Sequence, residues 1–227
     1  MSASFKPHLE ILPAGQRELW PKLTPAAGLG FALYGGTAVA LRLGHRASVD
    51  FDFFSDSPLD PEAIRRAFGW FAAARVLQES PNTLTLLVPY GDPEHTGVKV
   101  SFFGMDGFCR VGEPEVTDDR VAQVASLDDL MATKLKVVLQ RAEAKDYRDI
   151  AAMLAAGCSL PIGLAAASAL FGPSFQPSES LKALVYYGDG DLHLLTPNER
   201  QSLITAVSGV RDLPKVSIRS GRLTARV

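Results

Sequence analysis

This chain of 227 residues has little cysteine, little histidine and no large excess of charge of either sign. Its two cysteines, Cys109 and Cys158, are far apart and have no metal-ligand spacing, which argues against a disulfide scaffold and a cysteine-built zinc site. The 23 Lys and Arg residues nearly balance the 25 Asp and Glu residues, for a formal net charge of -2. The chain therefore lacks the overall basic charge of a dedicated nucleic-acid binder, although a local basic patch is left open.

The sequence also gives little sign of a targeting or membrane segment. It starts MSASFKPHLE, without an apolar signal-peptide core, so the default expectation is a cytoplasmic protein. Residues 150–171 carry no charge and reach the roughly 20 residues that a membrane span needs. Gly157 and Pro161 interrupt this run, and Ser159 between them is a favourable helix N-cap. We therefore expect two short buried helices and no membrane association.

What the sequence does have is apolar material, at 47% hydrophobic residues, which excludes whole-chain disorder. The patterning up to residue 115 indicates an α/β domain, and residues 116–227 indicate a helical domain. In the first part we expect helices at 15–23, 37–43 and 61–76 and strands at 31–34, 49–54, 83–88 and 98–103. In the second part we expect helices at 126–140, 142–156, 161–170, 179–187 and 197–207. Asp60, Ser126 and Ser159 are the expected N-caps.

The strand at 49–54 carries the first chemical signal. Val49, Phe51 and Phe53 are expected on one face, and Asp50 and Asp52 on the other. The two carboxylates would then lie about 6–7 Å apart on one side of the strand. Two like charges at this distance are costly unless a cation lies between them, and Mg²⁺ bridging to substrate phosphates is a common partner. Alone, an Asp-x-Asp pair is more often simply solvated.

A strand–Gly-Gly–helix junction at Gly35 and Gly36 carries the second signal. Backbone N–H groups at the start of a helix form a site for phosphate, and glycines let the anion approach closely. We expect Thr37 to cap this helix, Arg46 to add a donor, and Ser48 to face the same way as Asp50 and contact phosphate or be modified. A Gly-Gly turn by itself is commonplace.

Two charged side chains in the helical part are the third signal. Lys134 lies within an apolar stripe of its helix, where a lysine needs an anionic partner or ligand unless it extends to the surface. Asp146 lies in the first turn of the next helix, where a simple helix-start acid is the structural alternative.

Together these motifs resemble the nucleotidyltransferase fold shared with polymerase beta and, within it, the AbiEii-type nucleotidyltransferase toxins of bacteria. The resemblance covers roughly residues 31–154 and rests on the Gly-Gly turn, an Arg-x-Ser-x-Asp-x-Asp run at 46–52, Lys134 and the Lys145-Asp146 pair. It implies a mixed sheet with helices, followed by a helical C-terminal region that closes a cleft over the two aspartates.

The resemblance also implies an activity and its parts. The implied reaction moves a nucleotidyl group from a nucleoside triphosphate to an acceptor, which is left open between RNA or tRNA and protein, and the implied partner is an antitoxin. Asp50 and Asp52 would hold Mg²⁺ or Mn²⁺, and these two residues, Lys134 and Asp146 form the expected catalytic set. The expected phosphate-binding residues are Gly35, Gly36, Thr37, Arg46 and Ser48.

One departure from this pattern favours a second hypothesis. Active polymerase-beta-like enzymes often take a third carboxylate from a neighbouring strand, but the strand at 98–103 offers Lys99 and Ser101, and Asp106 lies just beyond it. The alternative is therefore a catalytically degenerate nucleotide-binding or interaction protein with the same fold. The basic tail at 211–227 is either a solvated terminus or a phosphate-contacting edge.

Overall fold

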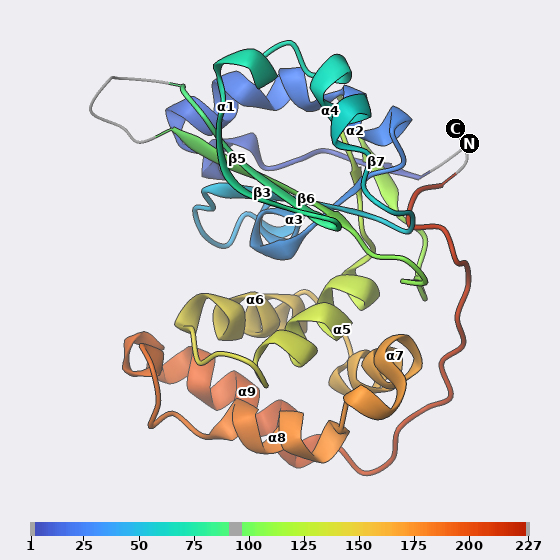
Figure 1. Ribbon diagram of the computed structural model, residues 1–227. Coiled ribbons are helices and arrows are strands. Elements are labelled where there is room, and N and C mark those ends of the chain that lie inside the picture. The colour runs from blue at the N-terminus through green and yellow to red at the C-terminus, as the bar shows by residue number, and fades with distance from the viewer. Residues whose placement is uncertain (1–2, 91–96, 226–227) are drawn as a thin grey trace. The chain divides into compact units, whose positions relative to one another are not determined.

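The computed structural model describes residues 3–90 and 97–225, which belong to two compact units (Figure 1). The first unit contains Met1–Cys109, Glu113–Ala125 and Ser220–Val227, and the second contains Arg110–Gly112 and Ser126–Arg219. Part of the turn expected after residue 88 and Arg226 of the basic tail lie outside the described residues. The sequence-based domain boundary after residue 115 stays a prediction.

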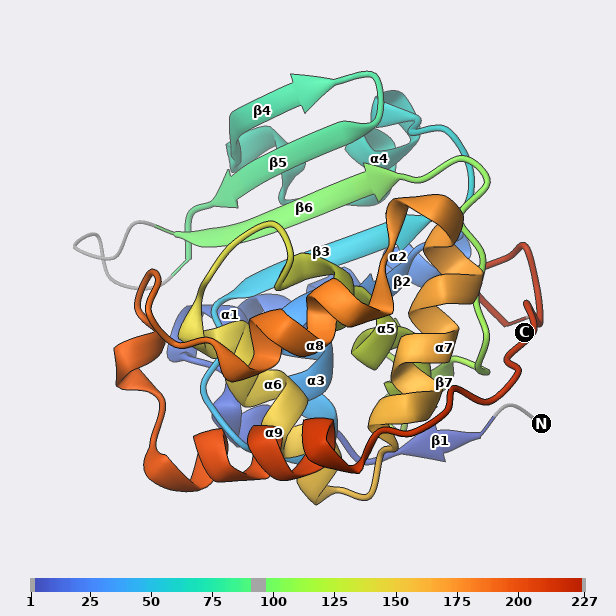
Figure 2. The same ribbon diagram turned by 90° about the horizontal axis from the view of Figure 1, so that it is seen from below.

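Eight strands among the described residues form one mixed sheet, all of it in the first unit (Figures 1 and 2). The order across the sheet is β1-β7-β8-β2-β3-β6-β5-β4. Strands β3 and β6 run parallel, while β2 and β5 are antiparallel to their neighbours β3 and β6. The strands are β1 (Ser4–Phe5), β2 (Ala32–Tyr34), β3 (Asp50–Ser55), β4 (Arg75–Ser80), β5 (Thr83–Val88), β6 (Val98–Gly104), β7 (Glu115–Thr117) and β8 (Gln123–Val124).

The core of the first unit lies on one face of this sheet. Phe51, Phe53 and Phe102 are fully buried there, with the Phe53 and Phe102 rings stacked at 5.5 Å between centroids. Helices α1 (Ala14–Leu19), α2 (Pro25–Gly28) and α4 (Pro61–Ala67) cover this face, whereas α3 (Gly35–Leu43) packs on the other (Figure 1). Burial of these aromatic rings contributes to the stability of the unit. The remaining short elements are η1 (Leu9–Ile11), η2 (Trp20–Leu23) and η3 (Phe71–Ala73).

The expected helix at 61–76 is wrong in its second half. Asp60 does cap α4, with its carboxylate accepting the Ala63 N–H, but the helix ends at Ala67. Gly69 follows, and glycine weakens a helix interior, so the chain turns and enters β4 at Arg75. Every residue of β4 is exposed, so its sequence shows none of the polar–apolar alternation that marks a half-buried strand.

The second unit is built from helices, as the sequence predicted for this part of the chain. They are α5 (Leu127–Val137), α6 (Ala144–Ala155), α7 (Leu160–Phe171), η4 (Gly172–Ser174), α8 (Pro177–Val185), η5 (Leu192–Leu194) and α9 (Pro197–Gly209). The expected caps are confirmed: Ser126 accepts the Asp129 N–H, and Ser159 accepts the Ile162 N–H. The uncharged run at 150–171 is divided between α6 and α7. Among the described residues, no helix combines the length and apolarity that crossing a membrane requires.

The tail beyond α9 has little regular structure, but its end is held by specific contacts within the first unit. The Gln123 side chain donates to the Ala225 carbonyl at 3.2 Å and accepts the Ala225 N–H at 2.7 Å. Leu223 is 1% exposed. Arg211, Lys215 and Arg219 are exposed. The described end of the tail is therefore anchored rather than frayed.

Candidate functional site

Strand β3 carries the two aspartates. Phe51 and Phe53 are buried, while Asp50 and Asp52 are partly exposed, so the alternation predicted for these four residues is confirmed. Val49, which the pattern grouped with the phenylalanines, is 53% exposed because the strand begins only at Asp50. The apolar core therefore fixes which way the carboxylates point, since a strand with one face buried must present its alternate residues on the other face.

Strand β6 determines what lies beside these carboxylates. In the parallel register Asp50 pairs with Lys99, and Asp52 pairs with Ser101. The Lys99 Nζ lies 2.8 Å from the Asp50 Oδ2. Ser101 is buried and accepts a hydrogen bond from the Thr85 hydroxyl at 3.5 Å. Asp106 follows the end of β6, whereas Asp52 pairs near the middle of that strand, so Asp106 does not occupy the register position next to Asp52.

The Gly-Gly junction lies directly against Asp52. Gly35 has φ +72, and a Cβ at this position would lie 2.7 Å from the Asp52 Oδ2. Any other residue would be strained in its backbone and would clash with the carboxylate. Helix α3 begins at Gly35, so the N–H groups of its first turn are close to an acidic side chain. A Cβ at Gly35 would fill the space between the start of α3 and the Asp52 carboxylate.

Thr37 does not cap α3, contrary to the sequence-based expectation. The N-cap is Tyr34, because the helix starts two residues earlier than expected, at the first glycine. The Thr37 hydroxyl instead hydrogen-bonds the Ser48 hydroxyl at 2.7 Å and the carbonyl of Asp50. Thr37 is 2% exposed and Ser48 is 7% exposed. These two hydroxyls join α3 to the start of β3 and so position the Asp50 backbone.

Arg46, the remaining expected phosphate ligand, lies in the loop between α3 and β3. Its guanidinium donates to the Ala47 carbonyl at 2.9 Å, and the residue is partly exposed. The roles predicted for Arg46, Thr37 and Ser48 toward phosphate stay predictions.

The second unit contains a buried charge cluster. The Lys134 Nζ lies 2.7 Å from the Asp146 Oδ1 and 2.6 Å from the Asp149 Oδ2. The Arg141 Nε donates to the Asp146 Oδ2 at 2.9 Å. The Lys134 side chain is 6% exposed and both aspartates are 0% exposed. Lys134 therefore points inward, as its position in the apolar stripe indicated, and does not extend to the surface.

The electrostatics of this cluster favour ionised side chains. Burial of the Asp146 carboxyl acts to raise its pKa, but the Lys134 ammonium and the Arg141 guanidinium outweigh burial, so the pKa of Asp146 lies below its usual range. A buried ammonium is costly unless anions lie beside it, and two carboxylates lie beside that of Lys134. Lys134 and Asp146 belong to the second unit and Asp50 and Asp52 to the first, and their convergence on one cleft stays a prediction.

Sequence reasoning missed three charged residues of these contacts as functional candidates, namely Asp149, Lys99 and Arg141. Asp149 lies three residues after Asp146, on the same side of α6, so helical spacing was a usable signal. In the sequence, Lys99 stands out only because it lies on the strand where a third carboxylate was expected. Its pairing with Asp50 depends on the β3–β6 register, which joins segments nearly fifty residues apart and leaves no local pattern.

The aspartates suit a hard divalent cation, because ionised carboxylates are the oxygen donors that Mg²⁺ and Mn²⁺ prefer. Within the described part of the chain, no group of three or more His, Cys, Asp or Glu side chains gathers to hold a metal ion. Mg²⁺ bound together with phosphates usually keeps further oxygen ligands from substrate or water.

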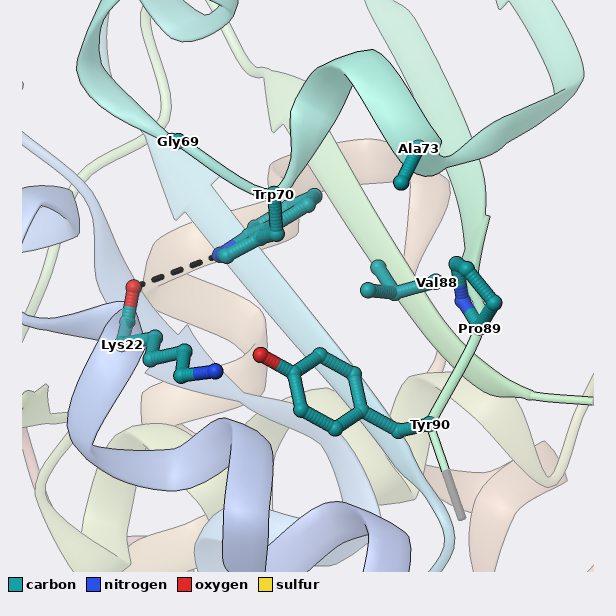
Figure 3. A pocket seen from close by; sticks show the side chains of 7 residues that line it. All are labelled: Lys22, Gly69, Trp70, Ala73, Val88, Pro89 and Tyr90. Carbon is teal, nitrogen blue, oxygen red and sulfur yellow. Dashed lines mark hydrogen bonds between the residues drawn. The ribbon is translucent and has the colours of Figure 1, made fainter. Parts of the chain in front are cut away.

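A hollow of about 440 Å³ lies elsewhere on the first unit (Figure 3). The Trp70 Nε1 donates to the Lys22 carbonyl at 3.3 Å there, and the Lys22 Nζ lies 4.6 Å from the centre of the Tyr90 ring. Val88, which also lines it, is buried on the apolar face of the sheet, whereas its neighbour Leu87 pairs with Lys99 on the face of the aspartates. The hollow contains none of the predicted site residues.

The sequence of the chain identifies its family. The sequence profile of the family described as nucleotidyl transferase AbiEii toxin, type IV toxin–antitoxin system, matches residues 23–179, more than half of the chain. The chain belongs to the AbiEii family. The matched range of this AbiEii chain includes every predicted site residue, from Gly35 to Asp146.

The chain also has a curated relative of similar sequence. Over 122 residues the chain is 34% identical to an uncharacterised protein of Aquifex aeolicus (strain VF5), a match that covers 53% of this chain and 55% of that protein. The AbiEii chain thus spans about half the length of this relative.

The nucleotidyltransferase toxin MenT4 of Mycobacterium tuberculosis has a similar structure, with a TM-score of 0.56 at 13% identity, covering 84% of this chain and 82% of that one. An antigenic nucleotidyltransferase-like protein of Paracoccidioides brasiliensis has a TM-score of 0.52 at 17% identity, covering 88% and 96%. At these identities the likeness shows a shared fold. The predicted nucleotidyltransferase fold, a mixed sheet with helices and a helical C-terminal region, is therefore confirmed.

Proposed function

We propose that this AbiEii-family chain transfers a nucleotidyl group from a nucleoside triphosphate to an acceptor. In this reaction an acceptor oxygen forms a bond to the α-phosphorus, the bond to the β-phosphate oxygen breaks, and pyrophosphate leaves. The observation that supports the proposal most is the packing of the Gly35 backbone against the Asp52 carboxylate, because the start of α3, proposed to bind phosphate, then lies beside an aspartate proposed to bind a cation.

Asp50 and Asp52 are the residues proposed to hold Mg²⁺ or Mn²⁺. When bound, such a cation neutralises charge that develops on the leaving pyrophosphate. The N–H groups of Gly35 and Gly36 bind phosphate oxygens at the start of α3, where the helix dipole favours negative charge. Thr37 and Ser48 hold the Asp50 backbone in place through their hydroxyls.

Lys134 and Asp146 are the proposed catalytic pair of the helical unit. In the proposal Lys134 contacts the triphosphate as a point charge, and Asp146 orients the lysine or accepts the proton from the acceptor oxygen. Their 2.7 Å contact and the lowered pKa of Asp146 support an ionised carboxylate that is ready to orient the ammonium.

The acceptor and the partner protein are further parts of the proposal. The family's membership of toxin–antitoxin systems supports an antitoxin as partner. For the acceptor we propose RNA, with tRNA as the first class to test and protein as the alternative. Exposed basic residues between α9 and the anchored end of the tail, Arg211 and Lys215 among them, offer contacts for RNA phosphates.

This RNA contact is tested by neutralising both residues, Arg211→Gln with Lys215→Gln, which leaves the Gln123–Ala225 anchor intact. RNA binding should weaken. The slope of log affinity against log salt concentration should become shallower by up to about two, because up to two fewer counterions are released. An unchanged salt slope would assign the tail a purely structural role.

The central experiment incubates the protein with each α-labelled nucleoside triphosphate, Mg²⁺ and total RNA, with Asp52→Asn as the matched inactive control. Label on RNA identifies an RNA acceptor, and label on a protein identifies a protein acceptor. Label must be lost with Asp52→Asn, because that change removes a carboxylate charge at nearly constant volume. If all four triphosphates leave both RNA and protein unlabelled, the transferase proposal is wrong.

The second candidate function is a catalytically degenerate nucleotide-binding or interaction protein. The pairing of Asp50 and Asp52 with Lys99 and Ser101, rather than with a third acid, favours it. Triphosphate binding that requires Asp52, without transfer of label in the assay above, would select this candidate.

A further inference from the structure

Lys99 contacts one of the two site aspartates but has no role in the proposed reaction. It lies on β6, a strand flanked by β3 and β5, and its register partners are Asp50 on one side and Leu87 on the other. Its Nζ lies 2.8 Å from the Asp50 Oδ2. A positive charge therefore contacts one of the two carboxylates that are proposed to bind a cation.

Stability does not account for this ion pair. The Lys99 side chain is 41% exposed and that of Asp50 is 32% exposed. Ion pairs with this much exposure contribute little to folding, and lysine is disfavoured in strands. By strand propensity, threonine or valine would suit this half-exposed position of β6 at least as well as lysine.

The charge of the site shows what Lys99 does. Two ionised carboxylates at this spacing repel each other, and the Lys99 ammonium offsets the charge of one of them. A divalent cation that binds both aspartates must compete with this ammonium for Asp50. A triphosphate arriving with that cation brings several negative oxygens, and the long, flexible lysine side chain carries three N–H donors that can move to them.

We infer that Lys99 is an exchangeable counter-ion, paired with Asp50 in the empty site and with a phosphate oxygen of the bound triphosphate. This inference rests on the proposed function, since it needs a cation on Asp50 and Asp52. Lys99 is then a residue that contacts the substrate. It weakens binding of the metal ion alone and strengthens binding of the metal ion together with nucleotide. The site is thereby kept from binding a divalent cation tightly until a triphosphate is present.

The experiment measures two affinities with opposite expected changes. For Lys99→Gln, titration with Mn²⁺ alone, followed by the paramagnetic resonance signal of free Mn²⁺, should show binding about tenfold tighter, because a nearby like charge is gone. Binding of a non-hydrolysable triphosphate in the presence of Mg²⁺ should become about tenfold weaker, because a phosphate contact is lost. Lys99→Arg should restore both affinities most of the way.

Controls separate this inference from a general effect of charge or folding. Lys22→Gln removes a lysine that lies by Tyr90, away from the aspartates, and should leave both affinities as in the wild type. Urea unfolding should show all three variants folded. If Lys99→Gln changes neither affinity, or changes both in the same direction, the inference is overturned.

The Asp52→Asn variant distinguishes this failure from failure of the proposed function. If wild type binds Mn²⁺ and Asp52→Asn does not, the metal site stands, and the Lys99 variants judge Lys99 alone. If Asp52→Asn binds Mn²⁺ as the wild type does, or if neither binds it at millimolar concentration with the non-hydrolysable triphosphate present, the metal assignment is wrong and the inference falls with it.

Discussion

Lysine is paired with aspartate both on the sheet and in the helical unit, but the two clusters differ in how far they are buried. In the sheet unit, Lys99 and Asp50 form one contact, with 41% of the Lys99 side chain and 32% of the Asp50 side chain exposed. In the helical unit, Lys134 has two carboxylate partners, and none of the three side chains is more than 6% exposed. The first cluster lies beside water and the second lies within a protein core.

This difference in burial sets what each cluster can do. A half-exposed pair is screened by solvent, so either partner can leave it at small cost. A buried pair cannot be broken by removing one partner without leaving an uncompensated charge in the core. The sheet cluster is therefore suited to exchange partners with a ligand, and the helical cluster is suited to hold one ammonium in a fixed place.

The largest effect is expected for Lys134→Met. This change keeps the apolar stem of the side chain but leaves the carboxylates of Asp146 and Asp149 without their shared partner, so we expect a loss of about 3–5 kcal/mol in the free energy of unfolding. Urea denaturation measures it. Lys145→Met, on the exposed side of α6, is the control and should cost less than about 1 kcal/mol. Equal losses in the two variants would show that burial of the cluster does not matter.

A smaller effect is expected for Gly35→Ala, which tests the contact between α3 and the sheet cluster. The left-handed φ costs about 1–2 kcal/mol for any residue with a Cβ, and the new methyl group must displace the Asp52 carboxylate. Triphosphate binding in the presence of Mg²⁺ should therefore fall much more than stability does. Gly28→Ala, where a Cβ meets nothing within 4 Å, is the control and should bind as the wild type. Normal binding by Gly35→Ala would remove this glycine from the site.

The pH dependence of unfolding sharpens the comparison further. The folded-state pKa of Asp146 lies below its usual range, so its ionisation stabilises the fold at pH values above the unfolded pKa, near 4. That stability should be lost as the pH falls from about 4 through the folded pKa. The free energy of unfolding of Asp146→Asn should therefore depend less on pH than that of the wild type between pH 5 and 2. Parallel curves for the two proteins would contradict the assignment.

The smallest effect on stability is expected for Asp50→Asn. Because the carboxylate is partly exposed and its pair with Lys99 is screened, the free energy of unfolding should change by no more than about 0.5–1 kcal/mol. Mg²⁺-dependent binding of triphosphate, measured by calorimetry, should nevertheless be abolished. Unchanged affinity in both Asp50→Asn and Asp52→Asn would exclude these residues as the metal site.

Local sequence patterns predicted the elements whose signals are complete within a few residues. The alternation from Asp50 to Phe53 gave the strand and its faces, since burial of one face requires a period of two. Ser126, Asp60 and Ser159 marked helix starts because a side-chain oxygen three residues before a free N–H caps it. Strand β4 was missed because it is exposed on both faces and pairs only along one edge with β5.

Some features of the candidate site were likewise predictable from local patterns, and others were not. The residue types at Gly35, Asp50 and Asp52 were recognisable from their spacing, and the inward position of Lys134 followed from helical periodicity. The identity of each partner did not follow. Thr37 joins Ser48 rather than capping α3, and Asp149 shares Lys134 with Asp146. Such partners are set by packing between elements, and among these contacts the i, i+3 spacing of Asp146 and Asp149 was the one local signal.

By itself, the sequence determined an α/β sheet part with an acid pair on one strand face, a helical part, and their membership of one toxin family. The strand faces and helix starts depend on periodicity and capping, which act over a few residues, and the family rests on a set of short motifs spread over much of the chain. Only the tertiary structure decided that Lys99 contacts Asp50 and that Asp146 and Asp149 hold one buried ammonium. Strand register and helix packing bring together residues that are distant along the chain, and the free energy of those contacts exists only once the core has formed.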